Sequence, residues 1–481
     1  MKATSLFGGV QVFNILITLV RGKAVAVLIG TAGMGMNGLF LSGVNLIKYL
    51  TSLGIEQSAV RDMSIAFTEE DPKKLEESYT VFKRWIYLTA ILGALVSFLF
   101  APMFSNFAFG DTSYANEFRW LSIVFVFTAI SGGIYTVLRA TRKLKLLAQA
   151  NILGAFLGLL VTLPILYFFG IDGVVPSIIV ASIVTYLISL YFRKKIELNA
   201  IDLTFKETFE RGKPMVVMGV NMSMSSLMGV GGAFALNAFI THKGSLSDLG
   251  LYSAGMSIMG GYVGMVFSAI GTDYFPRLSG AINQGDKWRD VVNQQAELVL
   301  IVLNLVLVLL VATVPVLIRV LLSIEFMETQ NFIIISSLGV LLKGYVWVTG
   351  FVILSKGDNK LFFIMELVAN GLLLILNMVL YSYWGLEGLG ISMIITYIFS
   401  SIFMYLLMGK KYFLKLSMDT YKLLAIGLIS LSIMVLTHFY IVGSFKFILL
   451  SFITLAFVAY QLFELDKRIQ LKDLLRKYLR K

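Results

Sequence analysis

The chain has 481 residues, of which 58% are hydrophobic and only 14% are charged. A soluble domain carries roughly 25% charged residues, so this composition excludes a soluble globular protein and is typical of a protein that resides in a bilayer. The sequence contains no cysteine, which excludes a disulfide framework and a thiolate metal site, and we expect no cofactor.

Apolar runs of about 20 residues recur along the whole chain, and each is long enough to cross a hydrocarbon core about 30 Å thick. They predict an all-α polytopic membrane protein with about fourteen transmembrane helices. The first run is similar to the apolar part of a signal peptide, but Arg21 and Lys23 stand directly before the site of cleavage, so we interpret it as a retained helix. The expected helices cover residues 6–30, 37–62, 84–104, 118–138, 148–169, 172–192, 214–240, 249–272, 296–321, 331–354, 361–383, 387–408, 422–440 and 446–463.

Positive charge is concentrated on one side of this arrangement. The net charge is +12, and most of the 40 Lys and Arg residues lie in segments on the same side as the N-terminus, whereas the opposite side holds only Arg119, Lys243 and Lys446. This bias predicts that both termini are cytoplasmic. The basic segment 464–481 is expected to hold that topology against anionic lipid, and we expect no nucleic-acid partner.

The two halves of the chain are similar to each other. Residues 38–40 recur as 250–252, and residues 167–173 recur as 381–388 with the same Gly-x-x-Gly hairpin. Two parallel six-helix repeats that form two lobes around a central cavity suit a transporter. The expected parts are an N-terminal lobe at 1–195, a cytoplasmic linker at 196–213, a C-terminal lobe at 214–410, two further helices at 411–463 and a basic tail at 464–481.

Three cations lie deep inside predicted helices, where each costs about 2.5 to 3.5 kcal/mol on insertion scales. Lys48 and Lys343 are expected near the midplane, and Arg21 lies about two-thirds of the way outward along the first helix. The acidic residues Glu56, Asp273 and Glu366 fall in the cytoplasmic third of their helices, so we expect no carboxylate at the level of the two lysines. Unpaired cations at the centre of a cavity predict an anionic substrate.

The first helix carries polar residues on one face. Gln11, Asn14, Thr18 and Arg21 have a 3-4-3 spacing, which places all four on the same side of a helix and makes them candidate substrate-binding residues. Lys23 lies about 200° around the helix from Arg21, so an unbroken helix cannot direct both cations into one cavity. Substrate binding and interfacial anchoring both stay open for Lys23.

Several segments resemble one family of transporters. Residues 2–12, 19–26, 30–35, 54–61 and 249–254 together resemble Wzx-type O-antigen translocases. These belong to the multidrug/oligosaccharidyl-lipid/polysaccharide exporter superfamily, which also contains lipid II flippases and drug extruders. The resemblance covers the whole chain in helix number and repeat, while its motifs are concentrated in the first quarter.

The resemblance implies a flippase that moves an undecaprenyl-pyrophosphate-linked oligosaccharide to the outer leaflet of the bacterial inner membrane by alternating access. Arg21 and Lys48 match basic positions of the family's first two helices. The assignment of Lys343 to the substrate site relies instead on its predicted depth in the membrane. The implied partners are the lipid-linked oligosaccharide, membrane lipid, a coupling H⁺ or Na⁺, and the polysaccharide polymerase machinery. The candidate ion-coupling residues are Glu56, Asp273 and Glu366.

Two alternatives remain. The first is a lipid II or drug exporter of the same superfamily, although an extruder of cationic drugs is expected to carry acids at the midplane. The second is a membrane enzyme such as a polysaccharide polymerase. The short external segments, the absence of a central histidine and the sixfold repeat argue against it, so we expect no enzymatic activity.

Overall fold

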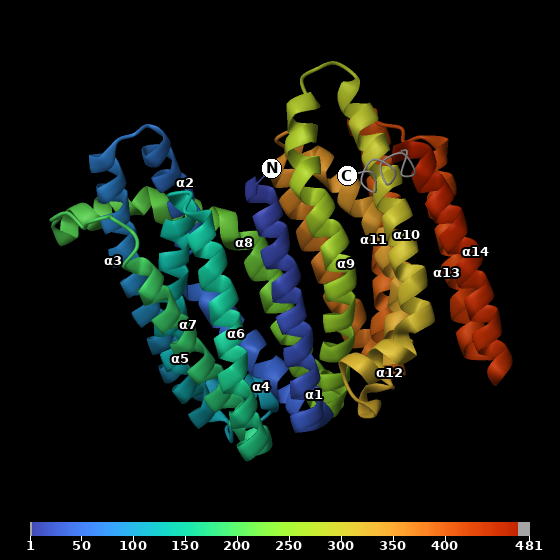
Figure 1. The fold of residues 1–481 in the computed structure, drawn as a ribbon, viewed down its shortest axis with the longest axis horizontal. Helices are drawn as coiled ribbons and strands as arrows, with labels where there is room; N and C mark the ends of the chain where they lie inside the picture. The colour runs from blue at the N-terminus through green and yellow to red at the C-terminus, as the bar shows by residue number, and fades with distance from the viewer. Residues whose placement is uncertain (1, 470–481) are drawn as a thin grey trace. The chain divides into compact units, whose positions relative to one another are not determined.

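The structure is a computed structural model that describes the backbone of residues 2–469 and the side chains of residues 17–468 except Ser444. All regular structure in this part of the chain is helical. Figure 1 shows the arrangement. The elements are α1 (Lys2–Thr51), α2 (Ile55–Thr68), α3 (Pro72–Leu99), α4 (Ala101–Phe109), α5 (Ala115–Ala140), α6 (Leu144–Phe169), η1 (Gly170–Gly173), α7 (Val174–Arg193), α8 (Phe205–Lys243), α9 (Leu246–Ala281), α10 (Lys287–Leu321), η2 (Ile324–Phe326), α11 (Thr329–Ser355), α12 (Asn359–Lys411), α13 (Met418–Tyr440) and α14 (Ser444–Ile469).

Eleven segments of the described chain are long and apolar enough to cross a membrane. Three of these segments each contain two consecutive helices, so each can cross the membrane twice. Both α1 and α12 consist of two helices joined at a kink, and α6 and α7 are joined through η1. The residues at these points, Gly30, Gly170 and Gly385, have φ of 65°, 56° and 55°, a region that favours glycine. The prediction of an all-α protein with about fourteen transmembrane helices is therefore confirmed.

One expected helix is broken. The sequence predicts a continuous helix over 37–62, but α1 ends at Thr51 and α2 begins at Ile55. Leu53 and Gly54 have φ of 51° and 63°, which takes the backbone out of the right-handed helical region. Lys48 consequently lies in the last turn of α1 and not in the middle of an unbroken helix.

Residues Met1–Gly250 form one compact unit and Leu251–Lys481 a second. In the first unit, α8 packs against α1, α2, α3 and α4. Gly219 of α8 meets the turn before α2 so closely that a Cβ there would lie 2.5 Å from the carbonyl oxygen of Leu53. Glycine permits this approach of two backbones, as at many helix crossings in membranes. The division expected from the duplication, which assigns 214–240 to the second lobe, stays a prediction.

The segment that joins α7 to α8 is held against the first unit by side chains of α3 and α7. The Arg193 guanidinium donates to the carbonyl oxygens of Ile196 and Leu198, each at 2.8 Å, and the backbone N–H of Ile201 donates to the Thr80 hydroxyl at 2.9 Å. We call residues 194–204 the strap. It ends in a capping box in which Thr204 caps α8.

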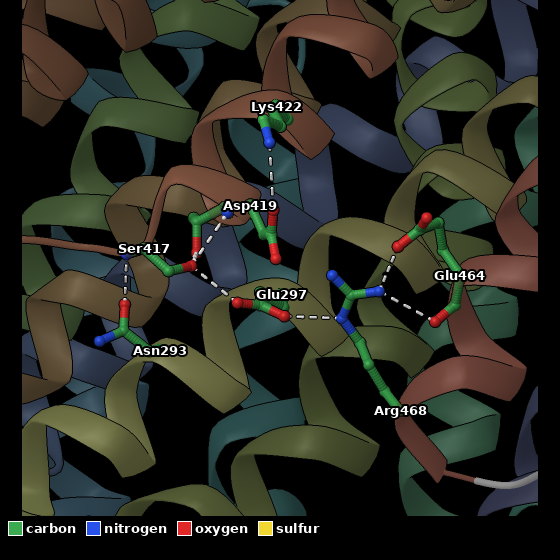
Figure 2. A network of polar contacts seen from close by, with 8 residues as sticks. Asn293, Glu297, Ser417, Asp419, Lys422, Glu464 and Arg468 are labelled. Atoms are coloured by element: carbon green, nitrogen blue, oxygen red, sulfur yellow. Dashed lines mark hydrogen bonds and ion pairs between the residues drawn. The ribbon is translucent and has the colours of Figure 1, made fainter.

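In the second unit, α10, α13 and α14 are joined by the polar network of Figure 2. The Ser417 hydroxyl caps α13 and donates to Glu297 at 2.7 Å, while the Arg468 guanidinium donates to the other oxygen of Glu297 at 2.6 Å. Arg468 also pairs with Glu464 one turn earlier in α14. Residues 464–469 of the expected basic tail are therefore helical, and residues 470–481 lie outside the described residues.

Candidate functional site

Lys48 lines a cavity of about 220 Å³ in the first unit. The turn between α1 and α2 brings residues from both helices around it, and Ser223 closes one side from α8. Most of the residues that line it have polar side chains, with amide, hydroxyl, ammonium and carboxylate groups. It consists of Asn45, Lys48, Tyr49, Ser52, Gly54, Glu56, Gln57 and Ser223.

The two charged residues of this cavity lie at helix ends whose partial charges have the opposite sign. Lys48 lies in the last turn of α1 and Glu56 in the first turn of α2. A helix has partial negative charge at its C-terminus and partial positive charge at its N-terminus, so both side chains are placed favourably. The break at Gly54 thus turns two residues that are eight positions apart toward one cavity.

Glu56 also packs closely against α5. A Cβ added to Gly132 would lie 2.5 Å from one carboxylate oxygen of Glu56, so the glycine leaves room for that group. Both Lys48 and Glu56 line a second, smaller cavity of about 20 Å³ with Thr89 and Thr128. No ion pair joins the lysine and the glutamate within the described residues, and both side chains are half-buried. The charged groups of Lys48 and Glu56 can therefore each contact a ligand.

The other predicted residues of the first helix lie elsewhere. Arg21 is half-buried in α1 before the kink at Gly30, and it is not among the residues that line the Lys48 cavity. Thr18 is exposed and Lys23 is half-buried on the same helix. Since α1 runs unbroken from Thr18 to Lys23, Lys23 and Arg21 point to different sides. The side chains of Gln11 and Asn14 lie outside the described residues.

Lys343 lines a larger cavity of about 510 Å³ in the second unit, between α11 and the two segments of α12. Its ammonium lies 6.0 Å from the ring centroid of Phe267 and 5.8 Å from that of Tyr397, within the range of cation–π attraction. The remaining lining is mostly apolar and aromatic, as with Trp347 and Phe351. The two aromatic rings stabilise the positive charge of Lys343 but do not neutralise it.

Further polar side chains line this apolar cavity, among them Glu366, Asn370 and Thr396. Glu366 is half-buried and accepts a hydrogen bond from the Asn370 side chain at 3.2 Å. Thr396 is 1% exposed, and its hydroxyl has no hydrogen-bond partner within the described chain. Buried hydroxyls are normally paired, so Thr396 is an unused donor in the wall of the cavity that also holds Lys343.

Each of the two lysines shares a cavity with an acidic residue, while the expectation that no carboxylate lies at the level of the lysines stays a prediction. Glu56 lines the Lys48 cavity and Glu366 lines the Lys343 cavity. Glu56 comes to the Lys48 cavity because the chain turns at Gly54, where the sequence predicts an unbroken helix. Asp273, the third acidic candidate, is exposed on α9 and does not line either cavity.

Sequence reasoning missed the uncharged groups that surround Lys48, namely Asn45, Gln57 and Ser223. A signal for two of them is present, because Gly54 marks a helix break and places the residues on both sides around one turn. No sequence signal points to Ser223, since α8 is far along the chain. Lysine with amides and hydroxyls can hold an anion that carries neutral hydroxylated groups.

The comparisons with known proteins agree with this architecture. A family described as "Polysaccharide biosynthesis protein" matches residues 24–331. No curated protein matches the chain. Among solved structures, an inward-facing multidrug resistance MATE family transporter of the MOP superfamily has a TM-score of 0.69 at 14% identity, over 82% of this chain and 93% of that one.

Two further solved structures are similar. The lipid II flippase MurJ in an inward closed conformation has a TM-score of 0.67 at 14% identity and covers 98% of this chain and 99% of its own. The MATE multidrug transporter DinF-BH has a TM-score of 0.61 at 19% identity, over 85% of this chain and 97% of that one. At these identities the likeness establishes the fold.

Proposed function

Because this chain belongs to the polysaccharide biosynthesis protein family, we propose that it is a flippase for a lipid-linked oligosaccharide. The transported molecule is an undecaprenyl-pyrophosphate-linked repeat unit of O-antigen or a related surface polysaccharide. The observation that carries the proposal is the polar cavity around Lys48, whose ammonium, amides and hydroxyls can receive a pyrophosphate and its first sugars. The protein moves this molecule and alters no covalent bond.

The two cavities support different parts of this task. The lining of the Lys48 cavity suits the polar head of the substrate, whereas the aromatic lining of the Lys343 cavity suits an apolar portion beside a negative charge. Arg21 supplies a further cation on α1. Transport by alternating access then requires an energy source, for which Glu56 and Glu366 are the coupling candidates because each shares a cavity with a lysine.

The experiment is a flipping assay with purified protein in liposomes that contain a fluorescent undecaprenyl-pyrophosphate oligosaccharide. We expect the label to move between leaflets and to be recovered chemically unchanged. The Lys48→Ala variant should lose this activity, while Lys73→Ala, which removes an exposed lysine at the start of α3, should keep it. A lengthened or cleaved glycan would instead identify a polymerase or hydrolase.

Lipid II belongs in the same assay, since the MurJ structure with a similar fold is named as its flippase. Lipid II shares the lipid pyrophosphate but carries a different glycan. Faster movement of lipid II than of the O-antigen unit would indicate that the protein is a lipid II exporter. A cationic dye as the third substrate tests the drug-exporter alternative, and we expect no transport of it because Lys48 and Lys343 repel a cation.

We place the protein in the bacterial inner membrane with both termini in the cytoplasm. The support is the bias of Lys and Arg toward one side of the spans. Fusion of alkaline phosphatase after Lys481 tests this topology. The fusion should be inactive, because the enzyme requires the periplasm, and an active fusion would refute the arrangement.

A further inference from the structure

A slot of about 170 Å³ lies between α3, α5 and α7 in the first unit, away from the lining of the Lys48 cavity. Helix α5 packs against both α3 and α7. The floor and walls of the slot are apolar and come from all three helices. They include Ile86, Ile130, Ile134, Val137 and Leu190. This volume is smaller than the roughly 300 Å³ of a drug-sized ligand pocket, so the slot suits a segment of one hydrocarbon chain.

Two basic residues, Lys83 and Arg193, are among the residues that line the slot. Lys83 is exposed, and Arg193 is the last residue of α7, from which the strap begins. No carboxylate is among the residues that line the slot. Lys83 and Arg193 therefore attract an anion, while most of the other residues that line the slot suit apolar groups.

Arg193 is fixed in place by the protein itself. Its guanidinium donates to the Tyr79 hydroxyl at 2.8 Å and to two carbonyl oxygens of the strap, and it lies 5.2 Å from the Tyr79 ring centroid. All of these partners are neutral, so the positive charge of Arg193 is not cancelled by them. Lys83 has no hydrogen bond or ion pair within the described chain, which leaves three N–H donors free for a ligand.

The slot opens toward an apolar surface. Tyr87, in the wall of the slot, is 45% exposed, and the same helix continues with the exposed side chains of Ile91, Leu95 and Phe98. A stripe of this kind on a spanning helix faces hydrocarbon. Lys83 and Arg193, next to the strap, mark the level at which the polar surface begins, on the side that carries most of the basic residues.

We propose that this slot binds one chain of an anionic phospholipid, with the phosphate on Lys83 and Arg193. The lining matches such a lipid, because it combines two cations with apolar side chains from three helices. An anionic head is selected since the slot presents two positive charges and no acid. The bound lipid would brace α3 against α7 and hold the strap that leads to α8.

The test is native mass spectrometry of the full chain in detergent with phosphatidylglycerol or phosphatidylcholine of equal chain length. The wild type should retain phosphatidylglycerol in preference. Lys83→Ala should weaken that binding about fivefold, the loss expected for one basic residue that faces an anionic lipid. Lys83→Arg should restore it, and Lys145→Ala, which removes an exposed lysine of α6, should leave it unchanged.

A second variant tests the slot itself. Ile130→Phe places a larger side chain in the slot and leaves both cations in place, so it should reduce retention of both lipids. Equal retention of the two lipids by the wild type, or full retention of phosphatidylglycerol by Lys83→Ala, would overturn the proposal. Since Lys83 is exposed, its replacement leaves folding intact and the result interpretable.

Discussion

Arg468 of α14 and Glu297 of α10 form an ion pair in which the guanidinium Nε lies 2.6 Å from a carboxylate oxygen. Both side chains are only 17% exposed, and Glu464 pairs with the same guanidinium (Figure 2). Arg468 thus forms ion pairs with two glutamates. The other oxygen of Glu297 accepts from Ser417, which caps α13, so a single carboxylate joins three helices.

We predict that Arg468→Ala detaches the end of α14 from α10. The substitution leaves two largely buried carboxylates without a counter-charge, and breaking a buried pair in this way costs about 3 kcal/mol or more. The measurement is thermal unfolding in detergent, in which the variant should melt clearly below the wild type. Lys467→Ala is the control because Lys467 is the exposed neighbour. Equal melting of the two variants would show that the network does not support this end of the unit.

A second prediction concerns the contact between α8 and the turn before α2. Gly219→Ala should destabilise the first unit by about 1 to 3 kcal/mol, because the new Cβ meets backbone atoms that cannot move away easily. Gly229→Ala is the matched control on the same helix, since a Cβ there meets nothing within 4 Å. The control should be neutral or stabilise by up to about 1 kcal/mol, as Ala favours a helix. Melting temperatures that fall equally in both variants would contradict the close packing.

The sequence predicts the helices well and the cavities poorly, and the reason is physical. A span of apolar residues is a local property that hydropathy records, and Gly30, Gly170 and Gly385 join the double segments as the pattern of runs predicts. A cavity depends on where helices cross. Glu56 comes to line the Lys48 cavity only because the backbone leaves the helix at Leu53 and Gly54, and no hydrophobic pattern records that change.

Contacts between residues far apart in the chain are a second feature that the sequence does not predict. Ser223 reaches the Lys48 cavity, and Arg468 reaches Glu297, across separations that no local periodicity encodes. The position of Lys343 in the middle of its helix was predictable, because α11 is unbroken. The unpaired hydroxyl of Thr396 beside it was not, since its lack of a partner is a property of the packed cavity.

A third prediction concerns pH at the junctions before and after α12. Asp358 accepts a hydrogen bond from Tyr412 and an ion-paired hydrogen bond from Lys411, and these contacts hold the pKa of its carboxyl below the ordinary value. A depressed pKa in the folded state gives stability that is present above the ordinary Asp pKa of about 3.9 and is lost as the pH falls through the folded value. Asp358→Asn should therefore lower the melting temperature at pH 7, and the difference from wild type should shrink below about pH 4. A difference that is constant from pH 7 to pH 3 would assign the effect to shape and not to charge.

The last prediction concerns the three cations Arg21, Lys48 and Lys343. A charge at the centre of a span costs about 2.5 to 3.5 kcal/mol on the insertion scale and less toward its ends, so replacement of these residues by Ala should leave membrane insertion intact or improved. Each replacement should nevertheless reduce transport, by about tenfold or more for a lost charge-assisted contact to the pyrophosphate. The measurement is surface glycan output in cells together with the abundance of each variant in the membrane.

Conservative replacements separate charge from shape in this series. Lysine acts as a point charge, so Arg should substitute at Lys48 and Lys343, whereas Lys in place of Arg21 loses a bidentate contact and should fail in part. The two cavities allow a further distinction, because Lys343 is flanked by Phe267 and Tyr397 and its planar replacement can stack on these rings. Normal output from all three Ala variants at normal abundance would show that these cations do not hold the substrate.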